Sequence, residues 1–201
     1  MNQTQDFTKG VIWKQLLFFF FPILIGSFFQ QLYNTVDTII VGQAVGTSAL
    51  AAVGSTGNLT NLIVNFYVGL STGASVVIAQ YYGAQNNKKI HQAVHTSYIL
   101  AIVSGILMML FGLFFSYQCL DAIGTPHDIL NDATLYMQLY FLCMIPGAIY
   151  NIGAGILRAV GDSKRPLYYL IVCSIVNVVF DFIFVVIFHQ GIAGAAVATV
   201  I

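Results

Sequence analysis

Residues 38–87 read TIIVGQAVGTSALAAVGSTGNLTNLIVNFYVGLSTGASVVIAQYYGAQNN, which is fifty residues without a charge. A membrane-spanning helix needs about 20 apolar residues, so this stretch is too long for one crossing. It is interrupted at residues 42–48 by GQAVGTS, a run of small residues that is typical of a helix end, a tight turn and a new helix start. The stretch therefore predicts two membrane helices joined by a short turn.

The composition of the whole chain also indicates a membrane protein. Of 201 residues, 58% are hydrophobic and 7% are charged, whereas a soluble domain carries about 25% charged residues. Seven basic residues balance seven aspartates, and the sequence contains no glutamate, so no nucleic-acid partner is expected. The three cysteines are odd in number and widely spaced, which argues against a disulfide framework and against a zinc site.

Other charge-free windows extend this pattern on both sides of residues 38–87. They predict an all-α integral membrane protein, a bundle of five complete transmembrane helices and an incomplete sixth. The expected helices cover residues 15–44, 48–82, 92–118, 132–157, 167–188 and, incompletely, 192–201. We expect the first apolar run to be a retained helix, because it continues past Asp37 and has no cleavage site of the kind that follows a signal peptide.

The basic residues predict the orientation of the bundle in the membrane. All seven fall in segments on one side of the expected helices: Lys9, Lys14, Lys88, Lys89, Arg158, Lys164 and Arg165. The connections on the other side carry acidic residues only. Because basic loops stay in the cytoplasm, we expect a multi-pass cell-membrane protein with its N-terminus in the cytoplasm.

Two carboxylates remain inside the expected spans, those of Asp37 and Asp181, and no lysine or arginine lies in any span. An ionisable group at the bilayer centre costs roughly 2.5–3.5 kcal/mol, so it normally faces a cavity or a partner. A rise of about 1.5 Å per residue puts both carboxylates in the outer half of the membrane. The alternative for each is a protonated, structural aspartate that hydrogen-bonds to a neighbouring helix.

Amide side chains share a helix face with each carboxylate. Gln30 and Asn34 precede Asp37 at helical spacing, and Asn177 lies one turn before Asp181. A polar stripe that ends in an unpaired aspartate favours a cavity lining over simple helix association. Protons and cations compete for such carboxylates, and amide oxygens beside them also suit a hard cation such as sodium. The residues by themselves leave proton and sodium as open alternatives.

Pro22 lies ahead of this stripe on the first expected helix. Proline removes a backbone hydrogen bond, so this helix is expected to bend near the cytoplasmic end of the polar face. The alternative is a static kink.

Four segments in order along the chain resemble the multidrug and toxic compound extrusion (MATE) family. They are NTVDTIIVG at 34–42, ALAAVG at 49–54, GILRAVGDSKRP at 155–166 and GIAGAAVAT at 191–199. The resemblance implies the N-terminal lobe of a twelve-helix transporter, with the C-terminal lobe absent from this sequence. It also implies a secondary transporter rather than an enzyme, which exports cationic drugs and other xenobiotics in exchange for protons or sodium and uses no other cofactor.

The resemblance also implies roles for individual residues. The coupling site for the proton, or for sodium, falls on Asp37, Asn177 and Asp181, and the helix-bending proline is Pro22. Roles in lining the substrate cavity fall on Gln30, Tyr136, Asn151 and Thr199, and Asn34 joins them by its place on the polar stripe. Some members carry a second asparagine one turn after the first on the fourth helix, and this chain has Ala154 at that position instead.

Other functions fit part of the sequence. A lipid-linked oligosaccharide flippase of the same superfamily needs cationic side chains for its pyrophosphate, and the expected spans contain none. An intramembrane aspartyl protease carries a GxGD motif, but the nearest string, AVGD at 159–162, lacks the first glycine and lies in a loop. A third possibility is that the chain acts by pairing with a second copy of itself. We expect no catalytic residue.

Overall fold

The computed structural model describes residues 11–200, so Lys9 lies outside the described residues. This part of the chain is helical and contains no strand. The helices are α1 (Ile12–Ala44), α2 (Thr47–Gly83), α3 (Asn87–Ala122), α4 (His127–Leu142), α5 (Met144–Ala159), α6 (Lys164–Asp181), the π-helix η1 (Phe182–Ile187) and α7 (Gly191–Val200).

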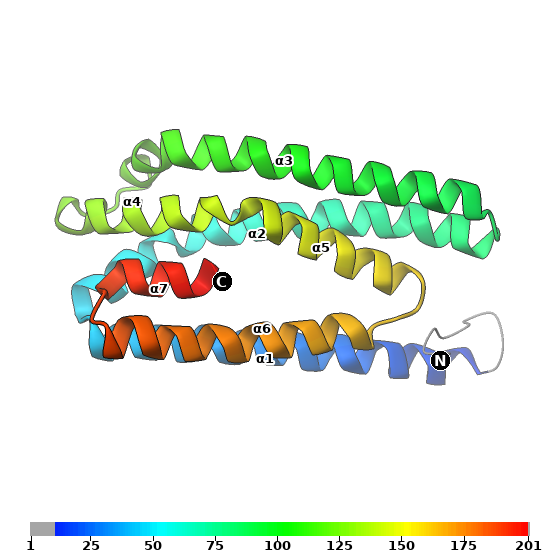
Figure 1. Ribbon diagram of the computed structural model, residues 1–201, viewed down its shortest axis with the longest axis horizontal. Helices are drawn as coiled ribbons and strands as arrows, with labels where there is room; N and C mark the ends of the chain where they lie inside the picture. The colour runs from blue at the N-terminus through cyan, green and yellow to red at the C-terminus, as the bar shows by residue number, and fades with distance from the viewer. Residues whose placement is uncertain (1–10, 201) are drawn as a thin grey trace.

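The helices form two groups that run along the long axis of the molecule (Figure 1). The α2 and α3 helices pack against the α4–α5 pair, while α1 and α6 pack side by side as the second group. The short α7 helix packs against α4, α6 and η1, and so connects the two groups at one end.

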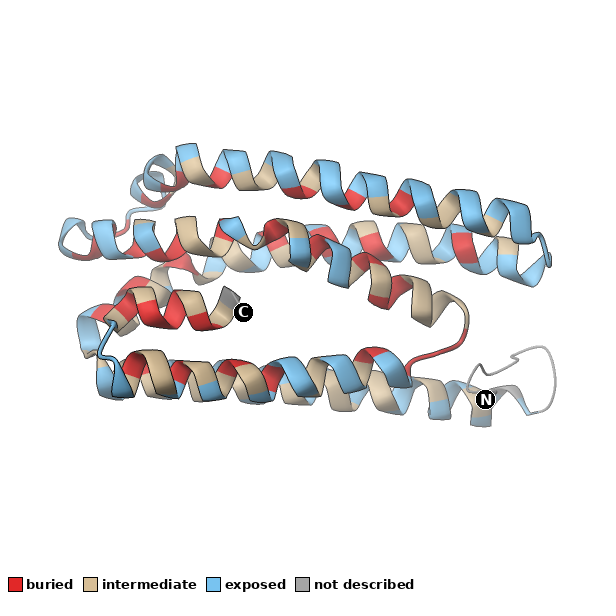
Figure 2. Ribbon diagram, in the orientation of Figure 1, coloured by how far each residue is buried: buried red, intermediate tan, exposed pale blue. Residues whose placement is uncertain are grey.

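The surface of the bundle is apolar. Many large apolar residues of α3 are exposed, and Phe114 is 70% exposed. Figure 2 shows that the exposed positions of α3 lie on its outer side and that the buried positions face the neighbouring helices. Within residues 11–200, four segments are long and apolar enough to cross a membrane: α1, α2, α3 and the continuous α6–η1 segment. The bent α4–α5 pair makes a fifth if it is one span. The prediction of an all-α integral membrane bundle is confirmed.

The single helix expected over residues 132–157 is divided in two. The α4 and α5 helices meet at Cys143 with a bend of 51°. Pro146 accounts for the break, because it has no N–H to donate to the carbonyl of Leu142 and its ring collides with that carbonyl. The backbone N–H of Gly147 donates to the carbonyl of Cys143 at 3.0 Å, so regular helical bonding resumes at once. The hydrophobic run continues through this point, so the expectation of one helix followed the apolar run and did not take Pro146 into account.

The helix expected over residues 167–188 also changes character. It is α-helical as far as Asp181 and then continues as the π-helix η1. The N–H of Phe188 accordingly donates to the carbonyl of Ile183, five residues earlier, at 2.9 Å. Such π-helical turns are rare and frequently lie at functional sites.

Glycines allow α2, α3 and the α4–α5 pair to approach one another closely. A Cβ atom added to Gly112 on α3 would overlap the ring of Phe141 on α4. One added to Gly155 on α5 would overlap the side chain of Ser71 on α2, whose hydroxyl donates to the carbonyl of Asn151 at 2.6 Å. Small residues at such crossings bring helix backbones together inside a membrane. These two glycines therefore set the spacing between α2, α3 and the α4–α5 pair.

Asp162 fixes the start of α6, and this leads to a prediction about stability. Its side chain is 2% exposed, and its Oδ1 accepts hydrogen bonds from the backbone N–H groups of Lys164 and Arg165, both at 3.1 Å. Its Oδ2 forms an ion pair with the Nε of Arg165 at 3.1 Å. We expect Asp162→Ala to lower the free energy of unfolding by about 1–2 kcal/mol, because it removes this cap.

A thermal melt in detergent measures this effect. Asp162→Asn, which keeps one acceptor oxygen, should lose less stability than Asp162→Ala. Asp121→Ala is the matched control, since Asp121 is an exposed aspartate at the end of α3. Equal losses at Asp162 and Asp121 would contradict a capping role.

Candidate functional site

The two carboxylates inside the membrane lie on neighbouring helices. Asp37 is on α1 and Asp181 is the last residue of α6, and these two helices pack along their length. Asp181 is fully buried and Asp37 is partly buried. The two carboxylates interact as a pair, although no hydrogen bond of good geometry joins them. The structure thus brings together two residues that are far apart in the sequence.

Several buried oxygens at this pair have no hydrogen-bond partner within the described part of the chain. They are Oδ1 of Asp37, Oδ1 of Asn177 and both side-chain oxygens of Asp181. A buried polar group without a partner costs about 1–3 kcal/mol. Four such oxygens therefore lie on two adjacent helices, α1 and α6.

Two more helices add hydroxyl groups to the same place. Tyr136 on α4 is buried, lies within electrostatic range of both aspartates, and interacts with the side chain of Thr199 on α7. The hydroxyl of Thr199 donates its hydrogen to the carbonyl of Ala195 at 2.9 Å, which leaves its oxygen able to accept. We call the group that α1, α4, α6 and α7 bring together the aspartate cluster; it consists of Asp37, Tyr136, Asn177, Asp181 and Thr199.

The aspartate cluster has no basic partner among residues 11–200. The one ion pair in that range joins Arg165 to Asp162 at the opposite end of α6. Nineteen residues separate Asp162 from Asp181, which corresponds to about 28 Å along a helix. Within residues 11–200, no basic side chain therefore neutralises the acidic charge of the cluster.

The remaining predicted residues lie elsewhere. Pro22 and Gln30 line a cavity of about 90 Å³ between α1 and the start of α6, to which Tyr150 and Arg158 also contribute. The α1 helix continues through Pro22. Asn34 is exposed, and its backbone carbonyl accepts from the hydroxyl of Thr38 at 2.7 Å.

Asn151 does not join the aspartate cluster. Its side-chain Nδ2 donates to the carbonyl of Gly147 on its own helix at 2.9 Å, and its backbone carbonyl accepts from Ser71 on α2. The bend at Cys143 changes the direction of the chain between Tyr136 and Asn151.

A group of tyrosines near the aspartate cluster was missing from the sequence prediction. Tyr33 interacts with Asp37 and Gln30, and Tyr140 and Tyr150 both lie within electrostatic range of Tyr33. These tyrosines connect the aspartate cluster with the small cavity at Gln30. Helical spacing could have indicated two of them, because Tyr33 is one turn from Asp37 and Tyr140 is one turn from Tyr136.

Comparisons with known proteins identify the family of this chain. The MatE family model matches residues 22–183, which is most of the chain. The chain belongs to the MATE family. The family that the sequence motifs indicated is therefore confirmed.

Individual MATE proteins are similar to this chain over nearly its whole length. It is 31% identical to the "Probable multidrug resistance protein YoeA" of Bacillus subtilis (strain 168), over 98% of this chain and 44% of that protein. A solved structure of MATE in the straight conformation superposes with a TM-score of 0.87 at 29% identity, over 93% of this chain and 41% of that one. A structure of MATE in the bent conformation gives a TM-score of 0.83 at 30% identity, over 89% and 40%. The chain thus spans less than half the length of these relatives.

Proposed function

We propose that this chain forms the N-terminal lobe of a MATE transporter that exports cationic drugs across the cell membrane in exchange for protons or sodium. In this proposal the N-terminus is cytoplasmic and the aspartate cluster is the coupling site. The observation that carries it is the set of unpartnered acidic oxygens of Asp37 and Asp181 in the interior of the bundle. The similarity to a probable multidrug resistance protein supports drugs as the exported class.

The chemistry of the aspartate cluster supports exchange. Two carboxylates side by side in a medium of low dielectric constant repel each other strongly when both are charged. A proton or a cation that binds between them removes this repulsion. Because the coupling ion and a cationic substrate use the same oxygens, binding of one disfavours binding of the other. This competition is what an antiporter needs in order to couple an inward flow of ions to an outward flow of drug.

The donor set accommodates either coupling ion. A proton needs only the carboxylate pair. Sodium is a hard cation that takes oxygen ligands, and Asn177, Tyr136 and Thr199 supply neutral oxygens beside the carboxylates.

A pyrophosphate headgroup would meet no cationic partner in this cluster, which disfavours the flippase alternative. In the AVGD string, Asp162 caps α6, which disfavours the protease alternative.

Transport by the full-length protein in inside-out vesicles tests the proposal. A proton gradient and a sodium gradient are imposed separately, and the movement of the cationic dye ethidium is followed by fluorescence. We expect one of the gradients to drive dye accumulation and the matching ionophore to abolish it. Dye movement that responds to neither gradient would contradict cation-coupled antiport.

A further inference from the structure

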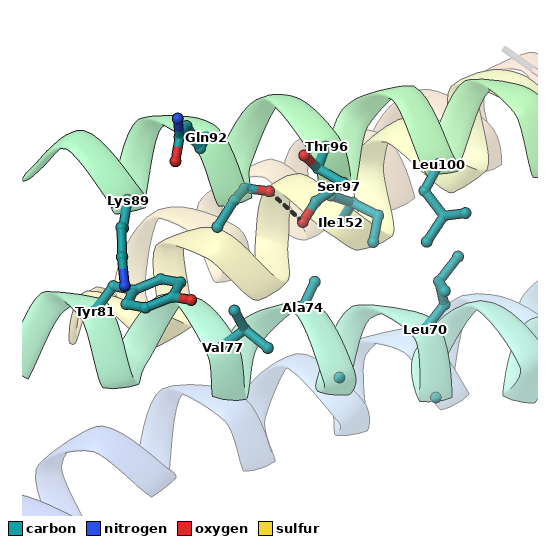
Figure 3. A pocket seen from close by; sticks show the side chains of 13 residues that line it. Leu70, Ala74, Val77, Tyr81, Lys89, Gln92, Thr96, Ser97, Leu100 and Ile152 are labelled. Atoms are coloured by element: carbon teal, nitrogen blue, oxygen red, sulfur yellow. Dashed lines mark hydrogen bonds between the residues drawn. The ribbon is translucent and has the colours of Figure 1, made fainter.

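A second site lies on the opposite group of helices, in a groove of about 540 Å³ between α2 and α3. Its polar end is formed by Tyr81, Lys89 and Gln92 (Figure 3). Toward the middle of the membrane the walls become apolar, with Leu70 on α2 opposite Leu100 on α3. The groove thus has one charged end, at Lys89, and one apolar end.

Glycines keep this groove open. Gly69 and Gly73 of α2 line it, and a Cβ atom added to either would meet nothing within 4 Å. They differ in this respect from Gly112 and Gly155, where a neighbouring helix already fills the space. Within residues 11–200, the space beside the two groove glycines is therefore open.

The length of the groove matches one leaflet of a membrane. Lys89 and Leu100, its two ends on α3, are eleven residues apart, which corresponds to about 16 Å of helix. Half of a bilayer core of about 30 Å is about 15 Å. An acyl chain whose headgroup lies beside Lys89 would therefore reach the apolar end.

The charge at the polar end selects the headgroup. The Nζ of Lys89 lies 5.3 Å from the centroid of the Tyr81 ring, a cation–π contact that holds the ammonium at the mouth of the groove. No acidic residue is among those that line the groove, and Lys89 forms no ion pair within residues 11–200. A single positive charge at the membrane surface attracts an anionic lipid headgroup.

We propose that the α2–α3 groove is a binding site for one anionic phospholipid. Lys89 binds the phosphate at the membrane surface, and an acyl chain lies against Gly69 and Gly73. This site is separate from the aspartate cluster and does not depend on the proposed transport activity.

Lipid binding to the full-length protein in detergent, followed by native mass spectrometry, tests the headgroup. Phosphatidylglycerol and phosphatidylcholine with the same acyl chains are titrated in parallel. We expect Lys89→Ala to weaken phosphatidylglycerol binding about fivefold, since one lysine near an anionic lipid surface contributes about 1 kcal/mol. Lys88→Ala is the matched control, because Lys88 has the same charge but does not line the groove, and it should bind the lipid as the unmodified protein does.

A second pair of variants tests the groove itself. Gly73→Leu should fill the open space and abolish retention of the lipid, whereas Gly54→Leu, at another open position on α2, should leave it unchanged. Both variants are expected to keep the melting temperature of the unmodified protein. Equal binding of the two lipids, equal loss in Lys88→Ala and Lys89→Ala, retention in Gly73→Leu, or displacement of the lipid by inorganic phosphate alone would each overturn the proposal.

Discussion

Asp181→Asn is expected to reduce gradient-driven dye efflux by the full-length protein to the level of empty vesicles, and Asp37→Asn is expected to do the same. Asparagine has nearly the shape of aspartate but neither takes up a proton nor carries the charge that binds a cation. Because both carboxylates act on each other within one cluster, we expect the double variant to be no worse than either single variant. The measurement is ethidium transport in vesicles under the driving gradient.

The stability of the same variants separates a coupling role from a structural one. Asp181 is fully buried, and neither of its side-chain oxygens has a partner in the described structure. Removing its charge should therefore leave the melting temperature unchanged or raise it. A structural aspartate would instead lower the melting temperature when replaced.

Controls for this experiment lie at the helix ends. Asp121→Asn makes the same chemical change at an exposed position on α3 and should transport at the rate of the unmodified protein. Gradient-driven efflux at that rate in both Asp37→Asn and Asp181→Asn would contradict the assignment of the coupling site.

Gly112→Leu is expected to produce the largest loss of stability. A Cβ atom at this position already overlaps the ring of Phe141, and leucine adds three more carbon atoms at the crossing of α3 and α4. Overpacking of a tight core costs about 1–3 kcal/mol and occasionally more. We expect a marked drop in the melting temperature and in the fraction of protein that elutes as a folded monodisperse species from a size-exclusion column.

Two further variants test the cause. Gly54→Leu introduces the same side chain where nothing lies within 4 Å, so its melting temperature should be unchanged. Adding Phe141→Ala to Gly112→Leu should recover part of the lost stability, because it removes the ring from the occupied space. If Gly112→Leu melted like Gly54→Leu, close packing of α3 on α4 would not be a determinant of the fold.

Some of the site could be predicted because it depends on helical spacing alone. Asn177 and Asp181 are four residues apart, and this spacing puts them on one face of any helix. Tyr136 and Thr199 entered only through the family resemblance, since nothing in their own segments relates them to an aspartate on another helix. Their place in the aspartate cluster follows from α7, which packs between α4 and α6.

Asn151, which the family resemblance assigned to the substrate cavity, lies beyond a bend that the expected helix did not contain. The expected helix over residues 132–157 would have carried Tyr136 and Asn151 along one straight axis, but the break at Cys143 separates them by a bend of 51°. The bend results from one missing backbone N–H at Pro146, and its angle depends on how α5 packs against α2 and α3. A pattern of hydrophobic residues contains no information on that angle.

By itself, the sequence of this MATE protein determined its environment and its helical class. These properties follow from the number of charges, the lengths of the apolar runs and the cost of an unpaired charge in lipid. Each of these can be read along the chain without knowing how the helices pack. Only the tertiary structure decided that Asp37 meets Asp181, that Gly112 and Gly155 are filled by neighbours, and that Gly69 and Gly73 are open. Contacts between helices depend on the angles at which the helices cross. Residues that are distant in the sequence determine these angles together.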